Sequence, residues 1–400
     1  AASNAEDAAL EHARRVLAAH PVIDGHNDLP WAIRENAEAP RDVEAYDLRD
    51  SVPGQTDLAR LKAGRVGAQF WSIYVPGEDR DSGYARIQLE EFDIARRMVA
   101  RYPDRLALAL TAEDIVRARR QGRIASLLGM EGGHAIENSL GALRAYYELG
   151  ARYLTLTHNV TLAWADAAQD TLKHGGLTPF GREVVREMNR LGMLVDLSHV
   201  SPGVMSNALD VAEAPVIFSH SSARALTNHL RNVPDSILAR LPQNGGVVMV
   251  TFVQSFVSEE RRLAELADDS AQAAIARESA DSVEGRRRWR AWREGHPLPR
   301  ATLSQVADHI EHVRKVAGAD HVGIGSDFDG MGPGPLGLED VSTFPALFAE
   351  LIRHGWSEAD LRKLAGENVI RALRQAEQVA ARLRKERPAS TATIEQLDGR

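Results

Sequence analysis

Five apolar runs of this chain each end in a short polar cluster of metal-ligand type. They are PVIDGHND (21–28), IASLLGMEGG (124–133), GMLVDLSHVS (192–201), PVIFSHSS (215–222) and HVGIGSDFDG (321–330). A buried strand needs only apolar residues, so a His, Asp or Glu directly after it must face solvent, a partner or a metal. The repetition indicates an active site at the carboxyl ends of the strands of a parallel sheet.

Eight apolar stretches are suited to buried strands, and helical segments separate most of them. The stretches are 22–24, 66–75, 124–130, 153–158, 193–199, 215–220, 246–252 and 321–327. Ser201-Pro202 predicts a helix start, Thr302 and Gln305 predict a capping box, and Ser357 opens another helix. This alternation predicts an α/β protein, a TIM-like (β/α)8 barrel.

The domain organisation follows from the same pattern. We expect a single barrel domain over 1–387, with a charged helical insertion at 258–300 and a poorly ordered tail at 388–400. The insertion lies between the last two predicted strands, so in a barrel it is on the catalytic face. It is either a helical lid or a solvated excursion or oligomer contact, and the sequence leaves these alternatives open.

Composition limits the partners and the metal chemistry. A net charge of −8 gives no broad basic face, so nucleic acid is not an expected partner. The chain has no cysteine, which excludes disulfides and thiolate ligands and leaves only N and O donors for a metal. No apolar run approaches the roughly 20 residues of a membrane span.

The candidate ligands stand at the ends of the predicted strands. His26 and Asp28 share one face, because residues i and i+2 of a strand point the same way. Glu131 precedes two glycines and could bridge two cations with its two oxygens. His199 and His220 each could be an ordinary structural histidine, but two on adjacent strands can converge on one ion.

Further polar residues point to the same face. His158 is either a ligand or a donor to the carbonyl oxygen of a substrate. Asp327 can take a proton from water and pass it to a leaving group, with Asp329 as the rival. Ser198 and the serines of 219–222 lie outside a G-x-S-x-G motif, which favours supporting hydrogen bonds over a nucleophilic role.

Seven motifs together resemble a known set. They are VIDGHNDLPW (22–31), GMEGGHAIEN (129–138), LTHN (156–159), DLSHVS (196–201), FSHSSARAL (218–226), RNVPD (231–235) and GSDFDG (325–330). In this order and spacing they resemble the motifs of the renal (membrane) dipeptidase family, from about residue 16 to 376. The resemblance implies a distorted, amidohydrolase-like barrel with two zinc ions per chain. It also implies hydrolysis of dipeptides, of L-X-L-X and L-X-D-X type.

The resemblance also implies roles for individual residues. His26, Asp28 and Glu131 match one zinc site, and His199, His220 and the shared Glu131 match the other. His158 and Arg231 match the substrate-binding histidine and arginine, and Asp327 matches the acid at the reaction centre. Because cysteine is absent, a homodimer of this chain would form without a disulfide. The first residues lack a signal peptide pattern, so a cytoplasmic, bacterial location is expected.

These roles combine into an expected mechanism. A metal-bridging hydroxide attacks the peptide carbonyl, and His158 with one metal stabilises the oxyanion. Asp327 carries the proton to the departing amine. Arg231 binds the free carboxylate of the substrate, which restricts the enzyme to short peptides, unless it forms a structural ion pair with Asp235 instead.

Other functions remain open at this point. A deaminase or a phosphotriesterase-like lactonase often uses a carboxylated lysine, yet none of the lysines ends a predicted strand. A non-catalytic metal-binding barrel is a second alternative, and intact candidates at every catalytic position argue against it. A purely structural oligomer component would leave the polar strand ends unexplained.

Overall fold

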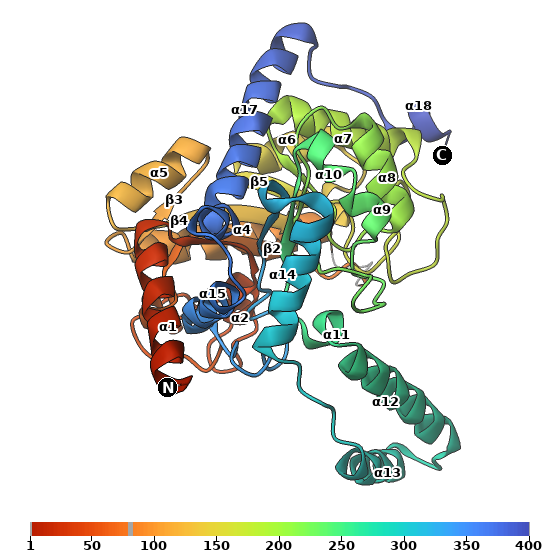
Figure 1. Ribbon diagram of the computed structural model, residues 1–400. Helices are drawn as coiled ribbons and strands as arrows, with labels where there is room; N and C mark the ends of the chain where they lie inside the picture. The colour runs from red at the N-terminus through yellow and green to blue at the C-terminus, as the bar shows by residue number, and fades with distance from the viewer. Residues whose placement is uncertain (1, 79–82, 400) are drawn as a thin grey trace.

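The computed structural model describes residues 2–78 and 83–399, and its centre is a parallel β-barrel (Figure 1). The strands are β1 (Val22–Asn27), β2 (Val66–Tyr74), β3 (Leu106–Leu108), β4 (Ile124–Glu131), β5 (Ala151–Thr155), β6 (Leu194–Asp196), β7 (Ile217–Phe218), β8 (Val247–Val250) and β9 (Val322–Ile324). Neighbours follow the order β2-β1-β9-β8-β7-β6-β5-β4, and a β2–β4 pairing closes the ring. The predicted TIM-like (β/α)8 barrel is confirmed.

Strand β3 was not predicted, and it lies outside the closed ring. It pairs only with the first residues of β4, from Leu106 beside Ile124 to Leu108 beside Ser126. From Leu128 onward, β4 pairs with β5 instead of β3. The apolar run LALAL (106–110) is present in the sequence, but it consists of Leu and Ala, which favour helices as much as strands.

Helices surround the barrel. Those that precede the insertion are α1 (Ala2–Ala19), α2 (Leu29–Arg34), α3 (Leu58–Ala63), α4 (Tyr84–Arg101), α5 (Ala112–Arg120), η1 (Gly133–Ile136), α6 (Leu140–Glu148), α7 (Pro179–Leu191), α8 (Pro202–Val211), α9 (Asp235–Leu238), α10 (Leu241–Asn244) and α11 (Gln254–Val257). After the insertion come α14 (Leu303–Ala317), η2 (Ala319–His321), η3 (Val341–Thr343), α15 (Phe344–Arg353), α16 (Glu358–Arg362), η4 (Lys363–Glu367) and α17 (Asn368–Glu386).

The predicted helix starts are confirmed at the level of single hydrogen bonds. The Ser201 side chain accepts from the Val204 amide at the start of α8, and Pro202 is the first residue of that helix. Thr302 and Gln305 form a complete capping box on α14, which ends before Gly318. Such caps satisfy amides that the first helical turn leaves without partners.

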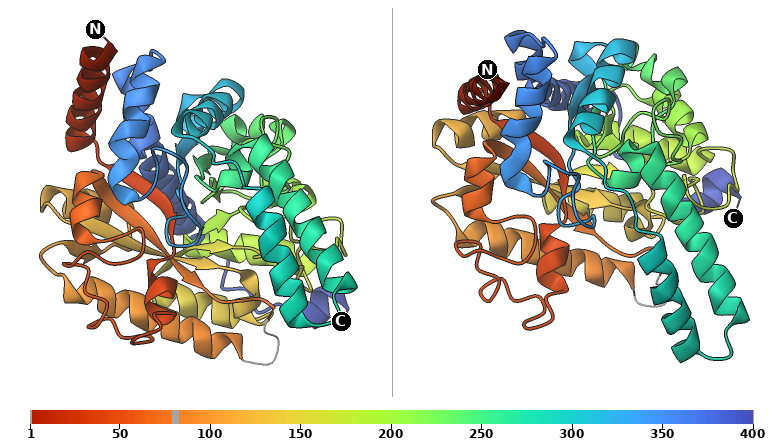
Figure 2. Two further views of the ribbon diagram at one scale, coloured as in Figure 1. Left: turned by 90° about the horizontal axis from the view of Figure 1, so that it is seen from below. Right: turned by 60° about the horizontal axis from the view of Figure 1, so that its bottom comes forward.

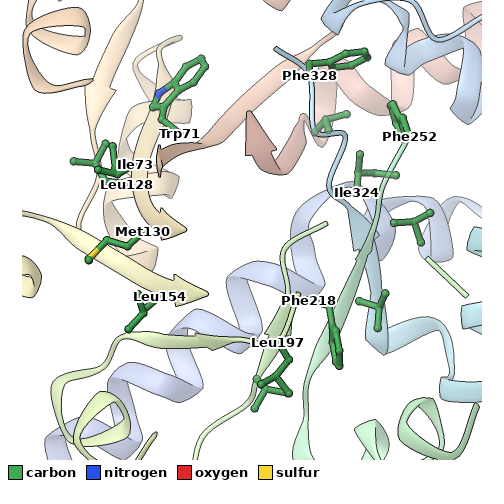
Figure 3. Packing of buried hydrophobic residues seen from close by; sticks show 14 of the residues in the cluster. Trp71, Ile73, Leu128, Met130, Leu154, Leu197, Phe218, Phe252, Ile324 and Phe328 are labelled. Atoms are coloured by element: carbon green, nitrogen blue, oxygen red, sulfur yellow. The ribbon is translucent and has the colours of Figure 1, made fainter. Parts of the chain in front are cut away.

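Two clusters of buried apolar side chains hold the layers together. The larger cluster fills the space between barrel and helices, and Figure 3 shows several of its members. There Trp71 and Ile73 of β2 pair in register with Leu128 and Met130 of β4. The smaller cluster combines alternate strand residues such as Phe70 with α17. Period-two alternation therefore places one set of strand residues inside the ring and the other against the helices.

The charged insertion forms a helical hairpin that projects from the barrel (Figures 1 and 2). Its helices are α12 (Glu259–Glu278) and α13 (Ser282–Gly295). Asp268, which pairs with Arg293, is the one buried side chain of α12, and every side chain of α13 is at least partly exposed. The hairpin therefore adds little to the core.

The C-terminal segment differs from its sequence-based expectation. Instead of a loose tail, α18 (Ile394–Asp398) lies against α7, and the Phe180 amide donates to Asp398 at 2.9 Å. A Thr393–Gln396 capping box starts the helix, and Ile394 is buried. These local signals are short, so the polar composition of the segment obscured them. Among the described residues, none of the helices is long and apolar enough to cross a membrane.

Candidate metal centre

The five predicted ligands meet at the carboxyl ends of the strands, around the carboxylate of Glu131. Its Oε2 lies 3.4 Å from Nε2 of His26, which in turn lies 3.2 Å from Asp28. Its Oε1 lies 3.0 Å from Nε2 of His199 and 3.4 Å from Nε2 of His220. The two oxygens of one side chain thus face two different sets of donors.

The backbone at the strand ends is shaped to aim these side chains. Gly132 has a φ of 115°, and a Cβ there would come within 2.1 Å of the His134 ring, so only glycine fits directly after Glu131. His199 and Asp327 have φ values of 70° and 73°, a region that costs free energy for residues with a Cβ. Such outliers cluster at functional sites, where the surrounding structure holds them in place.

Each of the three candidate ligand histidines is held through its other ring nitrogen. The Nδ1 of His26 lies 2.8 Å from the Tyr153 hydroxyl, and the Nδ1 of His220 lies 2.8 Å from the hydroxyl of Ser219. The Nδ1 of His199 lies 3.2 Å from Oδ1 of Asn159. These contacts leave all three Nε2 atoms directed at the centre, as in metal sites in general.

The sequence predicted a supporting hydrogen bond from Ser219, but not most of the other residues that hold the histidines in place. Ser219 also donates to Asp196, which accepts from Thr155 as well. Tyr153, Asn159 and Asp196 were not singled out. Asp196 is the first residue of the DLSHVS motif (196–201), so a buried Asp inside an apolar run was the available signal.

The donor set fits a metal cation. Nε2 of His26 is buried without a hydrogen-bond partner among the described residues, and the Nε2 atoms of His199 and His220 lie 3.1 Å apart. Burial lowers the pKa of both His199 and His220 well below the usual range. A nearby positive charge adds to this effect, from Arg231 at His199 and from His26 at His220. Although burial opposes its ionisation, the neighbouring histidines hold the pKa of Glu131 well below its usual range. His26 differs: although burial opposes the shift, Tyr153 and the carboxylates of Glu131 and Asp28 raise its pKa well above the usual range. Neutral His199 and His220 and an ionised Glu131 are in protonation states that bind metal, whereas a cation would have to displace the proton of His26.

Asp327 and Asp329 occupy different environments. Asp327 lies 3.8 Å from Nε2 of His26 and could complete a cluster with His26 and Asp28. Burial, reinforced by Asp28 and Glu131 against the opposing pull of His26, raises the pKa of Asp327 well above its usual range. Asp329 instead turns to the loop before α3 and accepts from the Gln55 amide at 2.8 Å. The geometry brings Asp327, and not its rival, to the centre.

His158 lies at the edge of the same group. Its Nε2 is 3.9 Å from Oε1 of Glu131, and its ring centroid is 4.4 Å from that of His199 and 4.9 Å from that of Tyr74. Its Nδ1 is buried and has no hydrogen-bond partner among the described residues. With Glu131 and His199 it forms another cluster of metal-ligand type, so both roles expected for it fit its position.

Arg231 is buried beside the histidines, with 2% of its surface exposed. Its guanidinium donates to the His220 carbonyl at 3.2 Å and lies over the Phe256 ring at 5.2 Å. Burial lowers its pKa to about 10, against the opposing effect of the nearby carboxylates. Asp235 pairs with His312 at 2.8 Å, so the alternative ion pair with Arg231 is not formed.

A parallel barrel with imidazoles and carboxylates gathered at its carboxyl ends is typical of metal-dependent hydrolases. The family model of membrane dipeptidase (peptidase family M19) matches residues 10–387, and the chain belongs to that family. It is therefore a dipeptidase with a metal cofactor, as the motif resemblance predicted.

Individual relatives agree with the family. Dipeptidase 3 of Mus musculus is 41% identical over 374 residues, which cover 92% of this chain and 67% of the relative. The crystal structure of the metallopeptidase dipeptidase AC is 28% identical, with a TM-score of 0.74 and 89% and 98% of the two chains covered.

Two further solved structures share the fold. A metallopeptidase from Rhodobacter sphaeroides, liganded with a phosphinate mimic of the dipeptide L-Ala-D-Ala, is 27% identical with a TM-score of 0.73, covering 89% and 99%. The probable dipeptidase PvdM from Pseudomonas aeruginosa has a TM-score of 0.81 at 24% identity, covering 94% and 100%.

Proposed function

We propose that this chain is a zinc dipeptidase whose two ions share Glu131 and which accepts dipeptides with an L- or a D-residue at the carboxyl end. The division of the two Glu131 oxygens between His26 on one side and His199 with His220 on the other carries this proposal. Zinc suits the site because all the donors are imidazole nitrogens and carboxylate oxygens.

The residues around the centre have separate tasks in peptide hydrolysis. Divalent cations bound there would supply Lewis-acid polarisation of the peptide carbonyl and acidify water. Asp327 is positioned to accept a proton from that water at Oδ1 and deliver it to the departing amine. His158, whose Nδ1 has no hydrogen-bond partner in residues 2–78 and 83–399, would donate to the oxyanion that develops on the carbonyl.

Arg231 would select for short substrates. A guanidinium binds a carboxylate through two parallel hydrogen bonds, and burial strengthens that contact because water does not compete. A dipeptide fits between this group and the centre with its free carboxylate on Arg231. The phosphinate mimic of L-Ala-D-Ala bound to the Rhodobacter relative supports acceptance of a D-residue at the carboxyl end.

A substrate panel on the zinc-loaded protein tests the proposal. The panel contains L-Ala-L-Ala, L-Ala-D-Ala, D-Ala-L-Ala, L-Ala-L-Ala-L-Ala and L-Ala-L-Ala amide, with free amine as the readout. We expect turnover of the first two, and little with the D-residue first, the tripeptide or the amide. Metal analysis should give two zinc ions per chain, and chelation followed by zinc should restore activity. One ion per chain, or equal turnover of the tripeptide, would contradict the proposal.

A further inference from the structure

A cavity of about 470 Å³ at the opposite end of the barrel carries five basic side chains. They are Lys62, Arg65, Arg105, Arg119 and Arg123. The cavity lies where β2 and β4 begin, at Val66 and Ile124, whereas Glu131 is the last residue of β4. The length of the strands therefore separates this cavity from the metal centre.

The charges of this cavity are not balanced by the protein. Its lining contains no Asp or Glu, and none of the five cations forms an ion pair within the part of the chain that the structure describes. Nearby arginines such as Arg60 and Arg117 are paired, with Asp57 and Asp114. Like charges gathered in one cavity repel each other unless an anion joins them.

Helix dipoles account for only part of this charge. Helices α1, α3 and α5 end near the cavity, at Ala19, Ala63 and Arg120, and each carboxyl end contributes roughly half a negative charge. The sum is about one and a half negative charges against five cations. An excess of positive charge remains available to a ligand.

Two of the arginines are held in place before any ligand binds. Arg105 donates to the Leu58 carbonyl at 3.3 Å, and Arg123 donates to the Pro103 carbonyl at 3.3 Å. Both are half-buried, while the remaining three cations are exposed. Positioned guanidinium groups lose less conformational entropy on binding than free ones do.

The remaining lining is apolar. Leu17 and Pro21 contribute to it, together with the first residues of β2 and β4. A volume of this size is typical of sites for small organic ligands. The cavity thus combines a cationic part that suits a multiply charged anion with an apolar part that suits a ring or hydrocarbon group.

We propose that this cavity binds a phosphate ester, with the phosphate dianion on the arginines and the organic group on the apolar lining. Arginine forks match the geometry of phosphate oxygens, and two or more of them can engage one dianion. The site is separate from the dipeptidase centre and does not depend on the proposed zinc chemistry.

Titration calorimetry on the metal-loaded full chain tests this proposal, with phenyl phosphate as the probe. The first double variant, Arg105→Glu with Arg123→Glu, changes the two arginines that are held by backbone carbonyls. The second, Lys62→Glu with Arg119→Glu, changes only exposed residues and therefore provides a test if the first variant does not fold. We expect each double variant to weaken binding at least about tenfold, which corresponds to about 1.4 kcal/mol. Turnover of L-Ala-D-Ala should remain, because neither pair lies at the centre.

A matched control separates the cavity from net charge. Arg287→Glu with Arg290→Glu on α13 makes the same charge change on an exposed helix surface. The control should bind within about twofold of the parent protein, a difference below about 0.5 kcal/mol. Unchanged binding in the folded cavity variants would assign the probe to the metal centre and overturn the proposal. Equal weakening in the control would overturn it as well.

A second arm identifies the source of the phosphate. Vesicles of phosphatidylcholine with phosphatidic acid are sedimented with the protein, against vesicles of phosphatidylcholine alone. If the parent protein sediments with the acidic vesicles and both cavity variants do not, the phosphate ester is a lipid headgroup. Binding of phenyl phosphate without such sedimentation would support a free ester, and failure of both probes would overturn the proposal.

Discussion

Glu131 is the residue on which both halves of the candidate centre depend, since its Oε2 faces His26 and its Oε1 faces His199 and His220. We expect Glu131→Gln to abolish high-affinity binding of both ions and to reduce activity more than His199→Ala or His220→Ala does. An amide presents one oxygen and no charge, so it replaces neither contact. Metal content and turnover measure this, with Glu137→Gln as an exposed control on the same segment. Two retained ions and near-normal turnover would refute the shared role.

The two neighbouring aspartates are predicted to differ sharply. Asp327→Asn should leave the metal content intact and lower kcat by about 10²–10⁴-fold, because proton transfer is lost. Asp329→Asn should be mild, since an amide oxygen can still accept from Gln55. Steady-state kinetics together with metal analysis distinguish them. The opposite ranking would move the catalytic role two residues along the chain.

Arg231 can be tested with a substrate that lacks its partner. Arg231→Ala should weaken kcat/KM for L-Ala-L-Ala by at least about 100-fold, because truncating one partner of a buried charge pair costs about 3 kcal/mol or more. The already slow L-Ala-L-Ala amide should change little, because mutation and amidation remove the same contact. Equal losses for both substrates would instead indicate that Arg231 supports the fold through the His220 carbonyl.

At the scale of residues, sequence patterning predicted which side chains would meet but not what holds them. Strand ends such as His26 and Asp327 could be placed because polar residues after apolar runs must share one edge of a parallel sheet. The contact between His26 and Tyr153 spans 127 residues and depends on a side chain reaching across the ring. No local pattern encodes such a contact, so the supporting layer required the structure.

Among the elements, the helical hairpin of α12 and α13 is predicted to be dispensable for stability. Replacing residues 259–299 with a Gly/Ser linker of about ten residues should change Tm by only a few degrees, because Asp268 is the one buried side chain of these helices. Differential scanning calorimetry provides the measurement. A large loss of Tm would show that the hairpin stabilises the barrel through contacts at its base.

Removal of the C-terminal segment 388–400 provides the contrasting experiment. This deletion takes away the buried Ile394 and the contacts of Ser390 and Asp398 with Arg144 and Phe180. We expect a clear decrease in Tm although fewer residues are removed than from the hairpin. If the hairpin deletion were the more damaging of the two, burial would be a poor guide to the role of these elements.

Element boundaries show what the sequence could and could not determine. Caps at Ser201, Thr302 and Ser357 were predictable because each is a short-range hydrogen-bonding motif. Strands were predicted too long: 193–199 shortens to Leu194–Asp196. The residues beyond Asp196 leave the extended conformation, and His199 adopts a positive φ. Hydrophobic patterning continues through such a turn, so it does not register the change of backbone direction.

For the molecule as a whole, buried histidines predict a loss of stability in acid. Burial lowers the pKa of His309 from 6.5 to about 4, and its Nδ1 accepts from the Ala223 amide at 3.0 Å. The unfolded chain binds the proton more readily, so stability is present above pH 6.5 and is lost as the pH falls towards 4. The full effect is about 3 kcal/mol.

Substitution of that histidine tests the effect. His309→Gln should be less stable than the parent at pH 7 and should lose less stability between pH 7 and pH 4, as measured by urea unfolding. His312→Gln, three residues further along α14 and partly exposed, serves as the control and should retain the acid dependence. Parallel pH profiles for the parent and His309→Gln would assign the acid loss to other groups.

The closure of the barrel joins the first strand to the last. Asp24 in β1 accepts from the amide and hydroxyl of Ser326, and the Asp28 amide donates to the Phe328 carbonyl, across some 300 residues of chain. During synthesis, His26 and Asp28 leave the ribosome some 300 residues before the segment that completes their surroundings. Long-range closure of this kind is slow, because distant parts of the chain must first meet. A nascent chain therefore cannot cleave peptides while it is being made, and the order of translation itself keeps the enzyme inactive until the barrel is closed.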